Sequence, residues 1–147
     1  MDSNNPNSFL ELEIIWKDEH MLELKVTATN GRYFGTTEVY DTSEALIAFA
    51  KSLHGYSNIS NALLYEAGKK DGYAYFAMLF YPLNSAGYIG LLVNLEENVP
   101  TEYRENEKDK LKLEIVVEPS AIDNFQKQLI RLATELSGTA ILYGRKN

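Results

Sequence analysis

The chain has 147 residues, of which 45% are hydrophobic and 24% are charged. This length suits one domain, residues 1–147, with a continuous core, and the composition is too apolar for a disordered chain. The formal net charge of −7 argues against nucleic-acid binding, because phosphate contacts need a clustered excess of Lys and Arg. The same charge favours a basic protein partner.

The chain contains no cysteine, which removes disulfides, thiolate nucleophiles and Cys-ligated zinc together. Residues 1–7 are polar and hold no basic segment followed by an apolar run, so we expect a flexible tail and no signal peptide. No apolar stretch approaches the roughly 20 residues that span a bilayer. These observations predict a cytoplasmic protein that does not bind membranes.

Alternation of apolar and polar residues predicts three strands at the start of the chain, joined by hairpins. Asp18, Glu19 and His20 are expected at the first loop tip, and Asn30-Gly31 predicts a tight second turn that sets Gly35 opposite Val26. A glycine in a strand indicates a bulge or a close approach of backbone. The expected core-facing residues are Leu10, Leu12, Ile14 and Trp16, then Leu22, Leu24, Val26 and Ala28, then Tyr33, Thr37 and Val39.

Two amphipathic helices are predicted, one after each group of strands. Asp41, with Glu44 three residues on, is the expected N-cap of the first helix, and Ser120 that of the second. Gly55 and Gly138 are expected to end them. Their apolar faces hold Leu46, Phe49, Ala50 and Leu53, and Ile122, Phe125, Leu129, Leu132 and Leu136.

Further strands are predicted over residues 62–67, 73–81, 88–95, 111–117 and 139–143. The second and third of these have little polar character and are expected to be central strands covered on both faces. Residues 96–110 hold six acidic and three basic residues and a proline, which predicts an exposed acidic loop. The fold class that follows is α+β: a largely antiparallel, meander-built β-sheet with two amphipathic helices packed on it.

No motif in the chain supplies chemistry. The cluster Asp18-Glu19-His20 resembles a metal site only in composition, because three adjacent residues do not converge easily on one ion. His54 sits in the last turn of a predicted helix, where its charge suits the helix dipole. The segment from Gly68 to Gly72 is followed by a strand, whereas a phosphate loop precedes a helix. We therefore expect no catalytic residue, no metal and no cofactor.

Two surfaces are candidates for binding a protein. In the acidic loop, Tyr103 is the expected anchor, because binding hot spots favour Tyr, and the surrounding carboxylates would attract a basic partner. On the first three strands, five large apolar residues lie on the face turned away from the core, which is more than a solvated face normally carries. The predicted partner-binding residues are Glu102, Tyr103, Glu105, Glu107, Phe34 and Tyr40, and the other apolar members of the outer face are Phe9, Ile15 and Met21.

The run from Asn30 to Tyr40, the helix of Leu46 to Leu53, and the corner from Val117 to Phe125 resemble a family of small, largely uncharacterised bacterial α+β proteins. Proteins of this kind are often suspected immunity proteins, which bind and block a toxin made by the same cell. The resemblance implies a protein partner and no catalytic residues.

The sequence thus favours a non-enzymatic protein-binding domain, of which an immunity-type inhibitor is the most specific form, and it is compatible with a homodimer. The alternative is a small-molecule binder or an enzyme that uses a tyrosine-rich sheet face. The tyrosines concerned are Tyr65, Tyr73, Tyr75, Tyr81 and Tyr88.

Overall fold

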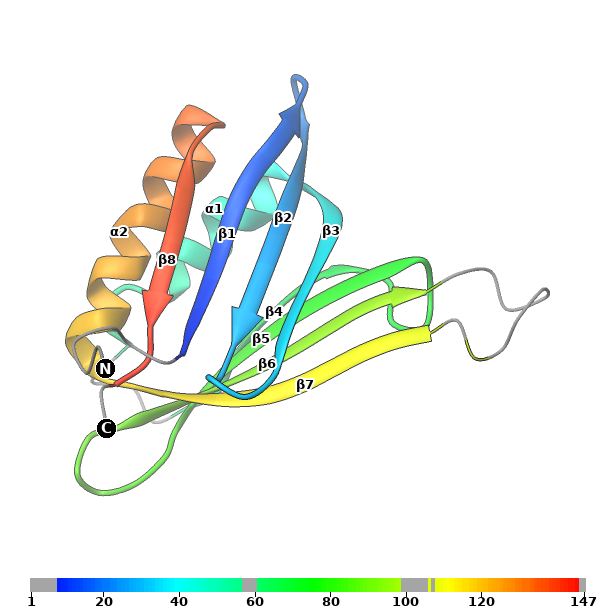
Figure 1. The fold of residues 1–147 in the computed structure, drawn as a ribbon. Coiled ribbons are helices and arrows are strands. Elements are labelled where there is room, and N and C mark those ends of the chain that lie inside the picture. Colours follow the sequence, from blue (N-terminus) through cyan, green and yellow to red (C-terminus); the bar gives the residue numbers. More distant parts are fainter. Residues whose placement is uncertain (1–7, 57–60, 99–105, 107, 146–147) are drawn as a thin grey trace, which may run out of the picture.

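The structure of the protein is a computed structural model, and it describes residues 8–56, 61–98, 106 and 108–145. Antiparallel strands and two helices make an α+β fold, as predicted (Figure 1). The elements are β1 (Phe9–Lys17), β2 (Met21–Thr29), β3 (Phe34–Thr42), α1 (Ser43–Ser52), β4 (Leu63–Gly68), β5 (Ala74–Pro82), β6 (Ile89–Asn98), β7 (Lys108–Val117), α2 (Pro119–Glu135) and β8 (Thr139–Tyr143).

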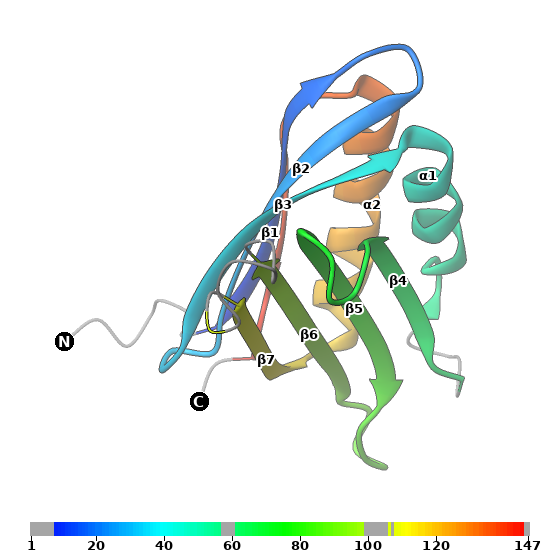
Figure 2. The ribbon, with the colours of Figure 1, turned by 90° about the vertical axis from the view of Figure 1, so that its right-hand side faces the viewer.

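The strands divide into two four-stranded sheets. Sheet 1 has the order β3-β2-β1-β8, and sheet 2 has the order β4-β5-β6-β7. Their strands cross rather than run parallel, and both helices lie on the inner side of sheet 1, next to sheet 2 (Figure 2). Phe49 of α1 joins the layers, because its ring lies 5.4 Å from that of Tyr65 and 6.0 Å from that of Phe80. One hydrophobic core therefore includes both sheets and both helices.

Four large side chains that were expected to face the core are buried there: Leu24, Phe49, Phe125 and Leu129. The expectation for Trp16 is wrong, since 46% of this residue is exposed. A bulge between Ile14 and Trp16 inserts one residue into β1 and reverses the alternation beyond it. Trp16 is thereby turned to the outer face of sheet 1.

The hairpin tips are partly as predicted. Asp18 is at the first tip, where its carboxylate accepts hydrogen bonds from the backbone N–H groups of His20 and Met21, at 2.9 and 2.7 Å. The second turn differs, because Gly35 pairs with Ala28 and not with Val26. Four residues form this loop, and the Asn30 side chain accepts the backbone N–H groups of its last two residues.

This change of register moves β3 by two residues, so it preserves the faces of the strand. Thr37 and Val39 point into the core, and Phe34 and Tyr40 point outward, as the alternation predicts. Tyr33 is the exception, because it belongs to the loop and is exposed instead of core-facing.

Both predicted N-caps are wrong by one or two residues. Thr42 caps α1, and its hydroxyl accepts the N–H of Ala45 at 3.1 Å. Asp41 is still part of β3, where its carboxylate accepts the hydroxyl of Tyr65. In α2, Glu118 occupies the N-cap position without a side-chain cap, because Pro119 already fixes the first helical residue.

The exposed acidic loop is shorter than predicted. Strand β6 continues to Asn98 and β7 begins at Lys108, so both ends of residues 96–110 belong to the sheet. Glu96 and Asn98 are buried, where a solvated loop was expected. Residues 99–105 and 107, and the expected tail of residues 1–7, lie outside the described residues.

Candidate functional site

Strand β3 lies across the inner face of sheet 2, and this crossing builds the candidate site. A Cβ atom on Gly35 would come within 2.6 Å of Leu111 Cδ2 and 3.5 Å of Leu95 Cδ1, so the missing side chain lets β3 approach sheet 2 closely. Two residues on, the buried hydroxyl of Thr37 donates to the carbonyl oxygen of Glu96 at 2.9 Å. The close approach of backbone suggested by a glycine in this strand is confirmed.

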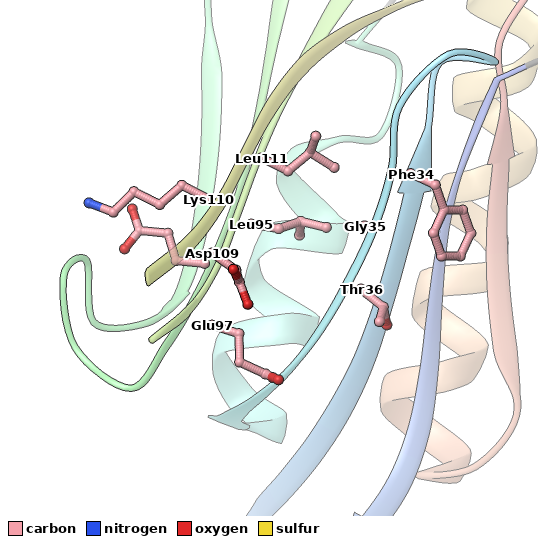
Figure 3. A pocket seen from close by; sticks show the side chains of 9 residues that line it. Phe34, Gly35, Thr36, Leu95, Glu97, Asp109, Lys110 and Leu111 are labelled. Atoms are coloured by element: carbon pink, nitrogen blue, oxygen red, sulfur yellow. The ribbon is translucent and has the colours of Figure 1, made fainter. Parts of the chain in front are cut away.

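Beyond this crossing, the ends of β5, β6 and β7 extend past β3 (Figure 1). An open cleft of about 370 Å³ lies between β3 and the β6–β7 pair. Leu95 and Leu111 lie between the two parts of the chain and form an apolar floor (Figure 3). We call this site the β3 cleft; it is lined by residues 34–36, 95–97 and 109–111.

Two carboxylates stand on the cleft side of the β6–β7 pair. Glu97 and Asp109 are direct partners in the register of these strands, and they follow the inward-facing Leu95 and Leu111 by strand alternation. Both are exposed, and Glu97 Oε1 lies 3.5 Å from the Thr37 hydroxyl. Like charges placed directly opposite each other destabilise a sheet. A cation bound between β3 and this pair would offset that cost.

The neighbouring polar residues point the other way and hold the end of sheet 2 in shape. Glu96 Oε1 accepts the backbone N–H of Asp71 at 2.8 Å, and Asn98 Nδ2 donates to the carbonyl oxygen of Gly72 at 2.8 Å. Lys110 pairs with the Asp71 carboxylate at 2.5 Å, which lowers the pKa of Asp71 and raises that of Lys110. The end of the β6–β7 pair that carries Glu97 is therefore held in place by contacts with Asp71 and Gly72.

The structure brings only part of the predicted site together. Phe34 is among the residues that line the β3 cleft and is 67% exposed, although its ring is turned away from Leu95 and Leu111 (Figure 3). Tyr40 lies six residues farther along β3, about 20 Å away at the usual rise of a strand. The remaining predicted residues, Glu102, Tyr103, Glu105 and Glu107, lie outside the described residues.

Tyr40 belongs to a second exposed aromatic surface. Its ring packs edge-on against that of Trp16, with centroids 6.0 Å apart. Ile15, which precedes Trp16 at the bulge of β1, is also exposed. The carboxylate pair Glu97–Asp109 and the apolar floor lie together in the β3 cleft, so this cleft is the stronger candidate.

The tyrosines of sheet 2 do not form one binding face. Tyr65 points into the core, where burial and the Asp41 carboxylate raise its pKa. Tyr75 is on the opposite face, and its hydroxyl donates to Glu66 at 2.5 Å. Burial and this bond raise the pKa of Tyr75 to about 12. Both hydroxyls are engaged within the protein, and these two tyrosines point to opposite faces of sheet 2.

Sequence reasoning missed most of the residues that line the cleft. Glu97 and Asp109 were assigned to a loop, although each stands two residues from an inward-facing leucine and continues the strand alternation. That alternation is the signal that identifies them. Among the described residues, no group of three His, Cys, Asp or Glu side chains is placed to hold a metal ion. Independence from metal stays a prediction, which thermal unfolding with and without a chelator would test.

Comparison of the chain with protein-family models, curated proteins and solved structures returns no match. Among the described residues, neither helix combines the length and the apolar character of a membrane span. The case for function therefore depends on the geometry of the β3 cleft.

Proposed function

We propose that the protein is a non-enzymatic binding module that holds a basic protein partner in the β3 cleft. The observation that carries this proposal is the opposed pair Glu97–Asp109 beside an apolar floor. A protein surface with lysine or arginine next to apolar side chains would relieve the like-charge pair and cover Leu95 and Leu111. The net charge of −7 would also speed the encounter with such a partner.

A narrower proposal is that the partner is a toxin and that binding blocks it. The resemblance of residues 30–40 and 117–125 to small bacterial proteins suspected of immunity supports this form of the proposal. Such a role needs affinity and shape, and it needs no catalytic group in the inhibitor. We place this role in the cytoplasm, as the sequence predicts. Co-expression tests the narrower proposal. Cells that express the captured partner alone should stop growing, and the wild-type protein should restore their growth whereas a cleft variant should not.

Site-specific photo-crosslinking tests the binding proposal. A photoreactive phenylalanine at Phe34, on the cleft, should crosslink one basic protein in a lysate of the cells that make this chain. The control is the same photoreactive residue at Leu64, which is 53% exposed and lies on β4, at the edge of sheet 2 opposite β7. Crosslinks of equal yield from both positions, or none from Phe34, would remove the β3 cleft as the binding site.

A further inference from the structure

Strand β3 is the outermost strand of sheet 1, so one of its edges has no neighbouring strand in the described part of the chain. Antiparallel partners alternate between pairs that exchange two backbone hydrogen bonds and pairs that exchange none. The N–H of Asn30 donates to the carbonyl of Tyr33, and the N–H of Ser43 donates to that of His20. These two bonds flank the β2–β3 ladder at its two ends.

Together with the register, these bonds identify the free backbone groups of β3. Gly35, Thr37 and Val39 fall on hydrogen-bonded positions and use their N–H and C=O groups on β2. The residues between them direct these groups away from β2, toward the free edge. The residues with free edge groups are Phe34, Thr36, Glu38 and Tyr40, and all four are exposed.

Edge strands β7 and β3 differ in their charged residues. Strand β7, an edge of sheet 2, carries Lys108, Lys110 and Lys112, and lysine on an edge strand discourages the addition of another strand. Residues 34–40 of β3 contain no lysine and no proline. At the place where it borders the β3 cleft, the free edge of β3 therefore carries neither lysine nor proline, and Glu38 is the charged residue among residues 34–40.

We infer that the partner binds by adding an extended, basic segment as a new strand along the free edge of β3. This inference rests on the proposed function and names the mode of recognition at the same site. Backbone hydrogen bonds would supply affinity, and side chains pointing into the cleft would supply specificity. The stems of lysine or arginine side chains fit over Leu95 and Leu111, and their charged ends reach Glu97 and Asp109. Side chains on the other face of the added strand lie beside Phe34 and Thr36.

Amide hydrogen exchange followed by NMR tests this inference with a defined probe: a short blocked peptide in which lysine and valine alternate. In the free protein, the amides of Thr37 and Val39 should be protected, and those of Thr36 and Glu38 should exchange fast. Saturation with the peptide should slow exchange at the second pair by about tenfold or more, as expected when a hydrogen bond forms. A peptide with glutamate in place of lysine is the matched control and should leave these rates unchanged.

Two variants separate the contributions of backbone and charge. Thr36→Pro removes a donor from the free edge but none from the β2–β3 ladder, and proline is tolerated on edge strands. It should abolish peptide binding while the amides of Thr37 and Val39 stay protected, which shows that the sheet is intact. Glu97→Lys combined with Asp109→Lys should abolish binding with the edge unaltered.

The possible results separate this inference from the proposed function. Crosslinking of a partner from Phe34 without protection of Thr36 and Glu38 by the lysine peptide would overturn strand addition and leave the binding function standing. Equal protection by the glutamate peptide would overturn the basic character of the segment. Protection of Thr36 and Glu38 that increases with protein concentration in the absence of peptide would overturn the inference. It would show that a second copy of this chain, and not a partner's segment, binds the free edge.

Discussion

Tyr56 is fully buried against Phe80, yet its hydroxyl has no hydrogen-bond partner among the described residues. Burial raises its pKa. Tyr65 shows the opposite solution to the same problem, because its hydroxyl donates to the Asp41 carboxylate. The two residues together test how much a satisfied hydroxyl contributes to this core.

Tyr56→Phe should leave the free energy of unfolding unchanged or raise it, since an unpaired buried hydroxyl costs roughly 1–3 kcal/mol. Tyr65→Phe is the matched control and should lower that free energy by about 1 kcal/mol or more, because Asp41 loses its donor. Urea unfolding of both variants measures the difference. A larger loss in Tyr56→Phe than in Tyr65→Phe would mean that the Tyr56 hydroxyl has a partner.

Tyr75 predicts a loss of stability at alkaline pH. Burial and the bond to Glu66 raise its pKa from 10.0 to about 12, so the folded state keeps this proton longer than the unfolded state. The stabilising effect is complete below pH 10 and is lost as the pH rises toward 12. In Tyr75→Phe, the free energy of unfolding should fall less steeply with pH over this interval, and the difference in slope should correspond to at most one bound proton. An unchanged slope would show that the Tyr75 hydroxyl titrates normally.

At the scale of elements, alternation and helical periodicity predicted the positions of all strands and both helices that the structure describes. What they could not predict were offsets of one to three residues, the largest at the end of β6 and at the start of β7. The bulge before Trp16 and the four-residue loop after β2 both keep the alternation on one side of the irregularity, so periodicity does not distinguish them from the expected geometry. The cap of α1 moved from Asp41 to Thr42 because a tertiary contact with Tyr65 holds Asp41 in the strand.

The predicted apolar seam of α2 faces the core, with Leu129 fully buried at its middle. Leu129→Ala should lower the free energy of unfolding by about 2–5 kcal/mol through lost burial and the cavity left behind. Leu64→Ala, at a position that is 53% exposed on β4, is the control and should cost much less. Equal losses in chemical unfolding would contradict the assignment of this seam to the core.

At the scale of the whole molecule, the sequence predicted an acidic loop and an apolar outer face, but not that residues of both line one cleft. Phe34 and Glu97 are 63 residues apart in the sequence and reach one cleft only because β3 crosses sheet 2. That crossing depends on the order of strands in two sheets, which periodicity does not contain. Gly35 was the sequence feature that indicated this crossing. It predicted a close approach to another part of the chain but not which part.

Two double variants test whether the local charge of the β3 cleft, and not the net charge of the protein, governs binding. Glu97→Lys with Asp109→Lys reverses the cleft. Asp123→Lys with Glu135→Lys makes the same change in net charge on α2, which packs on β8 at the opposite edge of sheet 1. Both pairs of side chains are exposed, so neither change should unfold the protein.

The most direct measurement uses the partner identified by crosslinking from Phe34. Its association rate is measured with the wild type and with these two variants, at low and at high salt. The cleft variant should associate at least about tenfold more slowly than the α2 variant at low salt, and the gap should narrow as salt screens the charges. Equal association rates for the two variants would contradict the account, because attraction would then depend on the total charge and not on Glu97 and Asp109.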